Sequence, residues 1–239
     1  MRKNSFLFVV MLFATLSLGF ASCDNDKGND PDDPIKNESS GFENGYAYVD
    51  LGLPSGLKWA TCNVGASKPE EKGDYFAWGE TEPKTTYDWS TYKWCEGTSE
   101  TLTKYNSRSH RGYVDEKTIL EPEDDTASVN MGGKWRMPTI VEVRELLDYC
   151  IWSSTTINEV NGYKVEGPNG NSIFFPVTGG MVGSNNPSAE NHLIAFWSSN
   201  RSTYYGQDYG AMNLQINTSD VHITYSNRYY GLVIRAVCL

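Results

Sequence analysis

The sequence predicts an α+β fold: a small, twisted, mostly antiparallel sheet with one main helix and long loops. One segment carries a complete helix signal, and many short apolar segments are separated by turn residues. The 22 glycines and the 13% aromatic content are typical of short elements around a β-rich core. At 239 residues, the chain is long enough to bury one sizeable core.

The helix is predicted to begin after Thr139. This residue follows Pro138 and precedes Glu142 by three positions, which is the pattern of a capping box, in which side chains satisfy free N–H groups. Behind this cap, apolar residues recur at helical spacing. The face that we expect to pack on the sheet comprises Ile140, Val143, Leu146, Leu147, Cys150 and Ile151.

The predicted strands are short and are punctuated by Gly, Pro and Asn. Pro54-Ser55-Gly56 predicts one turn, and Gly-Pro-Asn-Gly-Asn at 167–171 predicts a hairpin. The last segment is apolar on both faces except at Arg235, so we expect it inside the sheet. The strand segments are 46–51, 57–63, 75–78, 163–166, 172–176, 192–199, 211–216, 220–224 and 230–238.

Residues 80–126 are polar and irregular, yet they contain several aromatic residues. Long loops of this kind are usually functional or disordered, and the aromatic residues favour an ordered loop. We therefore expect a surface excursion that is pinned by Trp89, Tyr92, Trp94 and Tyr105.

The N-terminus predicts export. Residues 1–22 combine Arg2 and Lys3 with an apolar run and small residues, as a signal peptide does. The residues around Cys23 resemble a bacterial lipobox, so we expect Cys23 to be lipidated and to anchor the chain in the outer membrane. The alternative is an ordinary secreted protein in which Cys23 is free or forms a disulfide.

Residues 23–44 comprise Cys23 and a predicted disordered tether with high charge and little hydrophobicity. Its early aspartates resemble the surface-export signal of Bacteroidetes lipoproteins, which implies a location on the cell surface. A calcium loop is excluded because Ile35 stands where that loop needs a glutamate. A single folded domain is predicted for 45–239.

Four cysteines remain when lipid takes Cys23. In an exported chain an even remainder predicts disulfides, and four cysteines allow three pairings. Cys62, Cys150 and Cys238 end predicted elements and are the disulfide candidates, whereas Cys95 lies in the polar excursion. Because no two cysteines are spaced as C-x-x-C, a redox activity is not predicted.

Catalytic and metal-binding motifs are not recognised in the sequence. The histidines at 110, 192 and 222 are scattered, although a metal site would group them with other ligands. We predict no metal, no cofactor and no enzymatic activity. The net charge of −10 would repel phosphate backbones, so a nucleic-acid partner is not expected either.

Several motifs together resemble the Fibrobacter succinogenes major paralogous domain, which occurs in many Bacteroidetes surface lipoproteins. They are YVDLGLPSGLKWATCNVGA at 48–66, GDYFAWGE at 73–80, GGKWRMPT at 132–139, WSS at 197–199 and IRAV at 234–237. The resemblance implies a C-type-lectin-like fold and no established ligand.

The WRMPT segment also resembles the formylglycine-generating-enzyme superfamily. That family carries a catalytic cysteine pair near its C-terminus, and here Cys238 stands alone. The calcium-dependent sugar motifs of C-type lectins are not matched at 166–169 or 197–200, so calcium-dependent sugar binding is not predicted.

Two segments near the C-terminus are dense in Tyr, Ser, Asn, Gly and Arg, a mix that builds recognition loops. They are NRSTYYGQDYG at 200–210 and TYSNRYYG at 224–231. The alternative is that their rings only pack against the sheet. The candidate ligand-binding residues are Trp197, Asn200, Arg201, Tyr204, Tyr205, Asp208, Tyr209, Arg228 and Tyr229.

These observations favour a non-catalytic surface lipoprotein that binds an extracellular glycan or protein through its Tyr-rich loops. A structural or assembly subunit of a surface or fimbrial structure is the second hypothesis. An enzyme of the formylglycine-generating type is the third.

Overall fold

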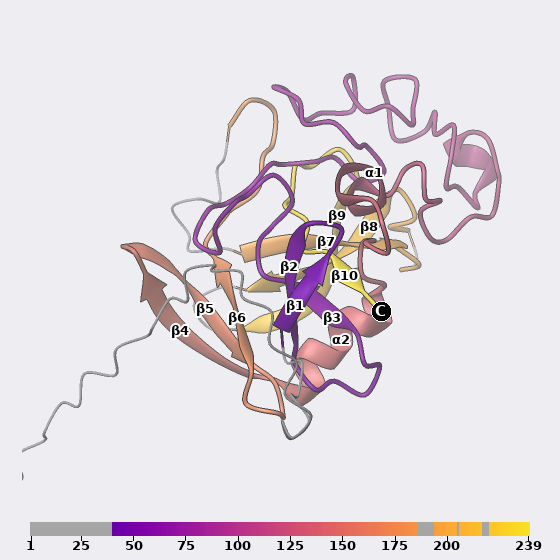
Figure 1. The fold of residues 1–239 in the computed structure, drawn as a ribbon. Helices are drawn as coiled ribbons and strands as arrows, with labels where there is room; N and C mark the ends of the chain where they lie inside the picture. The colour runs from indigo at the N-terminus through magenta and orange to yellow at the C-terminus, as the bar shows by residue number, and fades with distance from the viewer. Residues whose placement is uncertain (1–39, 186–193, 205, 217–219) are drawn as a thin grey trace, which may run out of the picture. The chain divides into compact units, whose positions relative to one another are not determined.

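A computed structural model of the chain describes residues 40–185, 194–204, 206–216 and 220–239. The predicted signal peptide, Cys23 and the tether up to residue 39 lie outside the described residues. The fold is α+β, as predicted: three antiparallel sheets carry most of the regular structure, with two short α-helices (Figure 1). None of the helices in the described ranges is long and apolar enough to cross a membrane.

The first sheet joins the two ends of the folded region in the order β1-β2-β3-β10. Its strands are β1 (Ser40–Glu43), β2 (Tyr46–Asp50), β3 (Lys58–Ala60) and β10 (Val237–Cys238). The predicted turn between β2 and β3 is confirmed, because the Gly56 N–H donates to the Leu53 carbonyl at 2.9 Å. The tether was predicted to extend to residue 44, but β1 pairs with β2 and therefore belongs to the fold.

The main helix, α2 (Ile140–Tyr149), begins where the sequence predicts. Thr139 and Glu142 form the complete capping box, and Val143 and Leu146 are fully buried. The helix lies against β7, β8 and β9. It ends earlier than predicted, because Ile151 starts the next strand and is 69% exposed.

A second helix, α1 (Thr126–Met131), was not predicted. Asp125 caps it by accepting from the Ser128 N–H at 2.9 Å, and the same carboxylate accepts from the Met137 N–H. Burial raises the pKa of Asp125 despite these hydrogen bonds. The helix was missed because its six residues are too few for a periodic apolar pattern.

The second sheet has the order β4-β5-β6, with β4 at Ile151–Ile157, β5 at Val160–Glu166 and β6 at Ser172–Pro176. The β5–β6 hairpin confirms the turn predicted at 167–171, where Gly170 has a φ of 84°. Strand β4 was not predicted. Its pairing with β5 extends the sheet outward as a hairpin (Figure 1).

The third sheet contains β7 (Ile194–Arg201), β8 (Gly210–Ile216) and β9 (Val221–Asn227). These strands confirm the predicted segments at 192–199, 211–216 and 220–224, apart from 192 and 193, which lie outside the described residues. The segment predicted at 75–78 forms only a single bridge, between Phe76 and Leu232.

The C-terminal segment is buried, but the prediction that it lies inside the sheet is wrong, because only Val237–Cys238 form a strand and this strand, β10, is the edge of the first sheet. The backbone of Val237 pairs with Trp59 of β3 and also with the backbone of Arg136. Arg235 is fully buried and donates four hydrogen bonds to neutral oxygens, those of Asn63, Ala60, Thr61 and Phe174. Burial without a hydrogen-bonded carboxylate lowers the pKa of Arg235 to about 10.

The interior holds two large apolar clusters and a smaller third one. The first surrounds Trp78, Trp135 and Trp197, and the second packs α2 and Trp59 against Phe175 and Phe196. The third cluster lies beneath the excursion and is built from Ala77, Tyr87, Tyr92 and Leu102.

The excursion at 80–126 is ordered by its aromatic residues, as predicted. The Tyr92 hydroxyl donates to the Trp78 carbonyl at 2.8 Å, and the Trp94 indole donates to the Gly79 carbonyl at 2.7 Å. Tyr105 is fully buried and donates to Asp124 at 2.6 Å. Only η1 (Ser109–Arg111) gives the excursion regular structure before α1.

The predicted disulfides do not form among the four described cysteines, which are all free thiols. Cys62, Cys95 and Cys150 are partly exposed, and Cys238 is buried. Cys150 ends α2 beside Glu145, and burial together with that negative charge raises the pKa of its thiol to about 11.

Candidate ligand-binding surface

Three partly exposed rings from different parts of the chain meet on one surface. Trp89 comes from the excursion, Tyr209 from the loop before β8, and Tyr229 from the segment after β9. The Trp89 ring lies edge to face with Tyr229 at 5.0 Å and with Tyr209 at 6.3 Å between centroids. We call these three residues the ring cluster.

A buried cation fastens the segments that carry the ring cluster. Arg228 is fully buried beneath it and donates to the carbonyls of Asp208 at 2.7 Å and Tyr105 at 2.8 Å. It also donates to the Gly210 carbonyl at 3.2 Å, so one side chain joins the excursion to the loop before β8. Burial lowers the pKa of Arg228. These bonds fix the rings without involving Arg228 in the surface itself.

One edge of the ring cluster is polar. The Arg111 guanidinium lies over the Tyr209 ring, 4.6 Å from its centroid, and its Nε is 3.5 Å from Oδ2 of Asp208. Neither of these two atoms makes a hydrogen bond in the structure. The ion pair thus holds Arg111 beside the rings without fully satisfying its donors.

Other polar groups lie next to the ring cluster. Asn227 donates to the Tyr229 hydroxyl at 3.5 Å, and the partly exposed Asp88 precedes Trp89. Burial raises the pKa of Tyr229, so its phenol stays protonated at neutral pH and can donate a hydrogen bond. Rings with apolar faces and flanking polar groups are typical of recognition surfaces.

Another ring pair lies on the same loops. Tyr204 is 49% exposed and rests on Tyr225 of β9, with centroids 5.7 Å apart. Tyr205, a further predicted binding residue, lies outside the described residues. Tyr204 is therefore the most accessible of the described tyrosines among the candidates.

Several candidates have structural roles instead of surface positions. Trp197 is fully buried, and its indole donates to the Phe76 carbonyl at 2.9 Å. Arg201 is 7% exposed and donates to the Lys117 carbonyl at 3.0 Å. Asn200 accepts from the Ile140 N–H at 2.8 Å, at the first turn of α2. Of the remaining candidates, Arg228 and Asp208 bond to the segments that carry the ring cluster.

Sequence reasoning missed Trp89 and Arg111 as members of this surface. Trp89 was identified only as a residue that pins the excursion, and Arg111 was not singled out. The sequence did show that this long polar loop is rich in aromatic residues, which indicates that the loop is ordered. It did not show which distant segment those aromatic residues contact.

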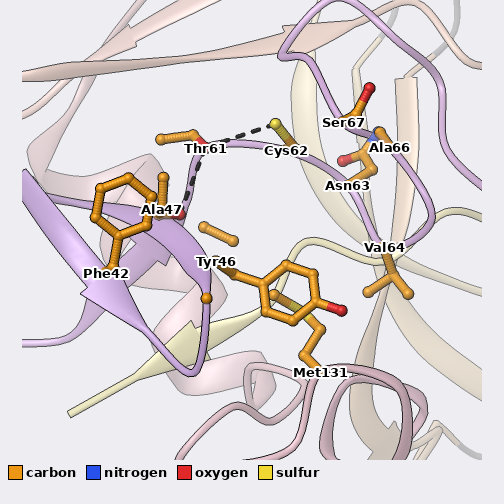
Figure 2. Close-up of a pocket in the computed structure, with 12 residues that line it drawn as sticks. Phe42, Tyr46, Ala47, Thr61, Cys62, Asn63, Val64, Ala66, Ser67 and Met131 are labelled. Carbon is orange, nitrogen blue, oxygen red and sulfur yellow. Dashed lines mark hydrogen bonds between the residues drawn. The ribbon is translucent and has the colours of Figure 1, made fainter. Parts of the chain in front are cut away.

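A hollow lies elsewhere, between the β1–β2 hairpin and residues 60–67. Its volume is about 370 Å³, and its lining is mostly apolar (Figure 2). Phe42 is 74% exposed and Tyr46 is 41% exposed at its rim, and Met131 of α1 lines it from the other side. Cys62 also lines this hollow, 3.5 Å from the Thr61 hydroxyl. None of the predicted binding residues lies here.

Among the described residues, no group of three or more His, Cys, Asp and Glu side chains could hold a metal ion. The densest polar group is Lys104 with Tyr105, Glu121 and Asp124. Lys104 lies 2.5 Å from both carboxylates, and Tyr105 donates to Asp124. Burial and that hydrogen bond raise the pKa of Tyr105, which disfavours a phenolate base. This group ties two parts of the excursion together, residues 104–105 and residues 121–124.

No known protein family, curated protein or solved structure matches this chain.

Proposed function

We propose that this chain is a non-catalytic, lipid-anchored module of the bacterial cell surface that binds an extracellular glycan through the ring cluster. The observation that carries the proposal is the meeting of Trp89, Tyr209 and Tyr229, from three separate segments, on one partly exposed surface. The two Tyr-rich segments predicted to bind contribute two of the three rings.

The chemistry of the surface fits a sugar. A pyranose ring has apolar faces of C–H groups that pack on aromatic rings, and its hydroxyls need donors and acceptors at the edges. Arg111, Asn227 and Asp88 supply such groups beside the rings. Rigid Trp and Tyr rings offer contact area at a low cost in conformational entropy.

The fold is proposed to be C-type-lectin-like, which remains an inference from the motifs at 48–66, 73–80 and 132–139. The small antiparallel sheets, the single main helix and the long excursion support it. Lipidation of Cys23 and the surface location rest on the N-terminal sequence. Mass spectrometry of Cys23 and protease treatment of whole cells test them. An intact protein without an acyl group would contradict both.

The binding test uses Tyr209→Ala and Tyr229→Ala on a glycan array, followed by titration of the best glycan. Each variant should weaken binding roughly tenfold or more, as truncation of an aromatic hot spot does. Tyr113→Ala is the matched control, since Tyr113 lies in the same excursion and is 68% exposed outside the ring cluster. Thermal unfolding must show that all three variants remain folded.

The hollow between β1 and residues 60–67 is the competing location. Phe42→Ala and Tyr46→Ala remove its exposed rim rings. If these two variants lose glycan binding while Tyr209→Ala and Tyr229→Ala keep it, the site assignment is wrong. If no glycan binds but an extracellular protein does, in a manner sensitive to Tyr209 and Tyr229, the ring cluster recognises protein.

A further inference from the structure

Strand β4 is a sheet edge with which no strand of the described ranges pairs on its outer side. It pairs with β5 on one side over all seven residues, and no described residue pairs with its other side. Six of its seven residues are exposed, and its ladder has no register shift (Figure 1). A long, regular, exposed edge is a template for pairing with another strand.

Most other sheet edges carry protection that β4 does not have. β1 has four residues and ends at Glu43, β6 ends at Pro176, and β10 has two residues. β9 is as long as β4 but is mostly half-buried. The β4 sequence, IWSSTTI, contains no charge and no proline, which are the usual means of blocking an edge.

The backbone direction of β4 follows from its neighbours. The Val177 N–H donates to the Asn161 carbonyl at 2.9 Å, so the backbone groups of Asn161 point toward β6. Since these directions alternate along a strand, Gly162 points toward β4 and is bonded to Thr155. The free N–H and C=O groups of β4 therefore belong to Trp152, Ser154 and Thr156.

We propose that two copies of this chain associate through β4, in an antiparallel pair whose twofold axis passes through Ser154. In that register Trp152 lies opposite Thr156 of the second copy, and Ser154 lies opposite its own equivalent. All three residues with free backbone groups then form hydrogen-bonded pairs, with about six new hydrogen bonds. The association goes beyond the proposed glycan binding and does not depend on it.

The strand that pairs with β4 comes from a second copy of the chain, because the β4 sequence is complementary to itself in this register. On one face, Ile151 meets Ile157, and these residues are 69% and 37% exposed in the single chain. Ser153 meets Thr155 on the same face, and hydroxyl pairs of this kind stabilise strand pairing. Although the chain has a net charge of −10, this strand brings no like charges together. An isologous pair of this kind closes as a dimer.

The face that carries Ser154 has room for side chains. A hollow of about 370 Å³ lies there, lined by Ser154, Thr156, Asn161 and Tyr163 among others. A larger side chain at position 154 therefore fits the single chain, so a charged residue can be placed there to test the association. Ser154→Lys and Ser154→Glu would each place like charges opposite each other across the axis.

The experiment measures association of the full chain by sedimentation velocity over a concentration series. The wild type should show a reversible monomer–dimer equilibrium, and Ser154→Ala should preserve it. Ser154→Lys and Ser154→Glu should each weaken association roughly fivefold or more, as like charges opposite each other do. An equimolar mixture of the two should form a heterodimer in native mass spectrometry.

Hydrogen exchange identifies the surface used. On raising the protein concentration, the amides of Trp152, Ser154 and Thr156 should slow, while those of Ser153 and Thr155 should not change. A wild type that stays monomeric at its highest soluble concentration would overturn the proposal. Two other results would also overturn the proposal. One is equal association of the wild type and both charged variants, and the other is concentration-dependent protection of amides at another sheet edge.

Discussion

Trp89 and Tyr229 lie edge to face with their ring centroids 5.0 Å apart, although one belongs to the excursion and the other to the C-terminal segment. Their contact makes a single surface of two parts of the chain that share no strand. Arg228 joins these parts by donating hydrogen bonds to the carbonyls of Tyr105, Asp208 and Gly210.

Replacing Arg228 by Met should destabilise the fold by roughly 2–4 kcal/mol, because several buried carbonyls lose their donor. Equilibrium denaturation by urea measures this free energy of unfolding. Arg108→Met is the matched control, since Arg108 lies exposed in the excursion and should change stability little. Equal stability of the two variants would contradict the role assigned to Arg228.

Asn200→Ala should lower the free energy of unfolding by about 1 kcal/mol, because the Ile140 N–H at the start of α2 loses its acceptor. Asn200→Asp should retain most of the stability, since a carboxylate also accepts and interacts favourably with a helix N-terminus. Thermal unfolding of both variants at neutral pH tests this order. The prediction is wrong if Asn200→Ala keeps the wild-type stability while Asn200→Asp loses it.

Glu142 should make stability depend on pH. Burial alone would raise its pKa, but hydrogen bonds from Arg136 and the Thr139 N–H outweigh burial and lower it. A lowered folded pKa stabilises the fold above the unfolded value near 4.5, and that stability is lost as the pH falls through the folded pKa.

The difference in free energy of unfolding between wild type and Glu142→Gln should therefore shrink as the pH falls below about 4.5. Denaturation at pH 7, 5, 4 and 3 measures it. Glu145→Gln serves as the control for removing a carboxylate from the same helix. A constant difference across this range would show that the Arg136 pair does not act through charge.

Cys150 should alkylate slowly in the folded chain. Because its pKa is raised to about 11, little thiolate is present at pH 8, and the rate should rise nearly tenfold per pH unit up to pH 10. Iodoacetamide kinetics in a chain with the other cysteines replaced by Ser measure this profile. In urea the rate should level off near the ordinary thiol pKa of about 8.5. A plateau below pH 9 in the folded chain would contradict the prediction.

Local signals in the sequence predicted the elements that depend on local chemistry. The capping box of Thr139 and Glu142 located the start of α2, and Gly and Asn at 167–171 located the β5–β6 hairpin. Both features depend on residues within a few positions of each other, so a single sequence contains all the information needed.

Features that depend on distant contacts could not be predicted in the same way. Strand β4 is polar and exposed, so it has no alternating apolar pattern, and its structure depends on pairing with β5. Arg228 and Arg201 belong to Tyr-rich segments that resemble recognition loops, and their burial depends on carbonyl groups far away in the sequence. For the same reason Trp89 could be recognised as ordered but not assigned to a site.

The pairing of β3 with β10 has a consequence for how the protein is made. Lys58 lies opposite Cys238, and Arg235 donates to the carbonyls of Ala60 and Thr61 at the end of β3. The first sheet is therefore incomplete until residues 235–238 have been synthesised. Strand pairs this far apart in sequence form slowly, since a long loop must close first. Removal of residues 235–239 would take β10 and Arg235 away from β3, so the first sheet would lose its fourth strand.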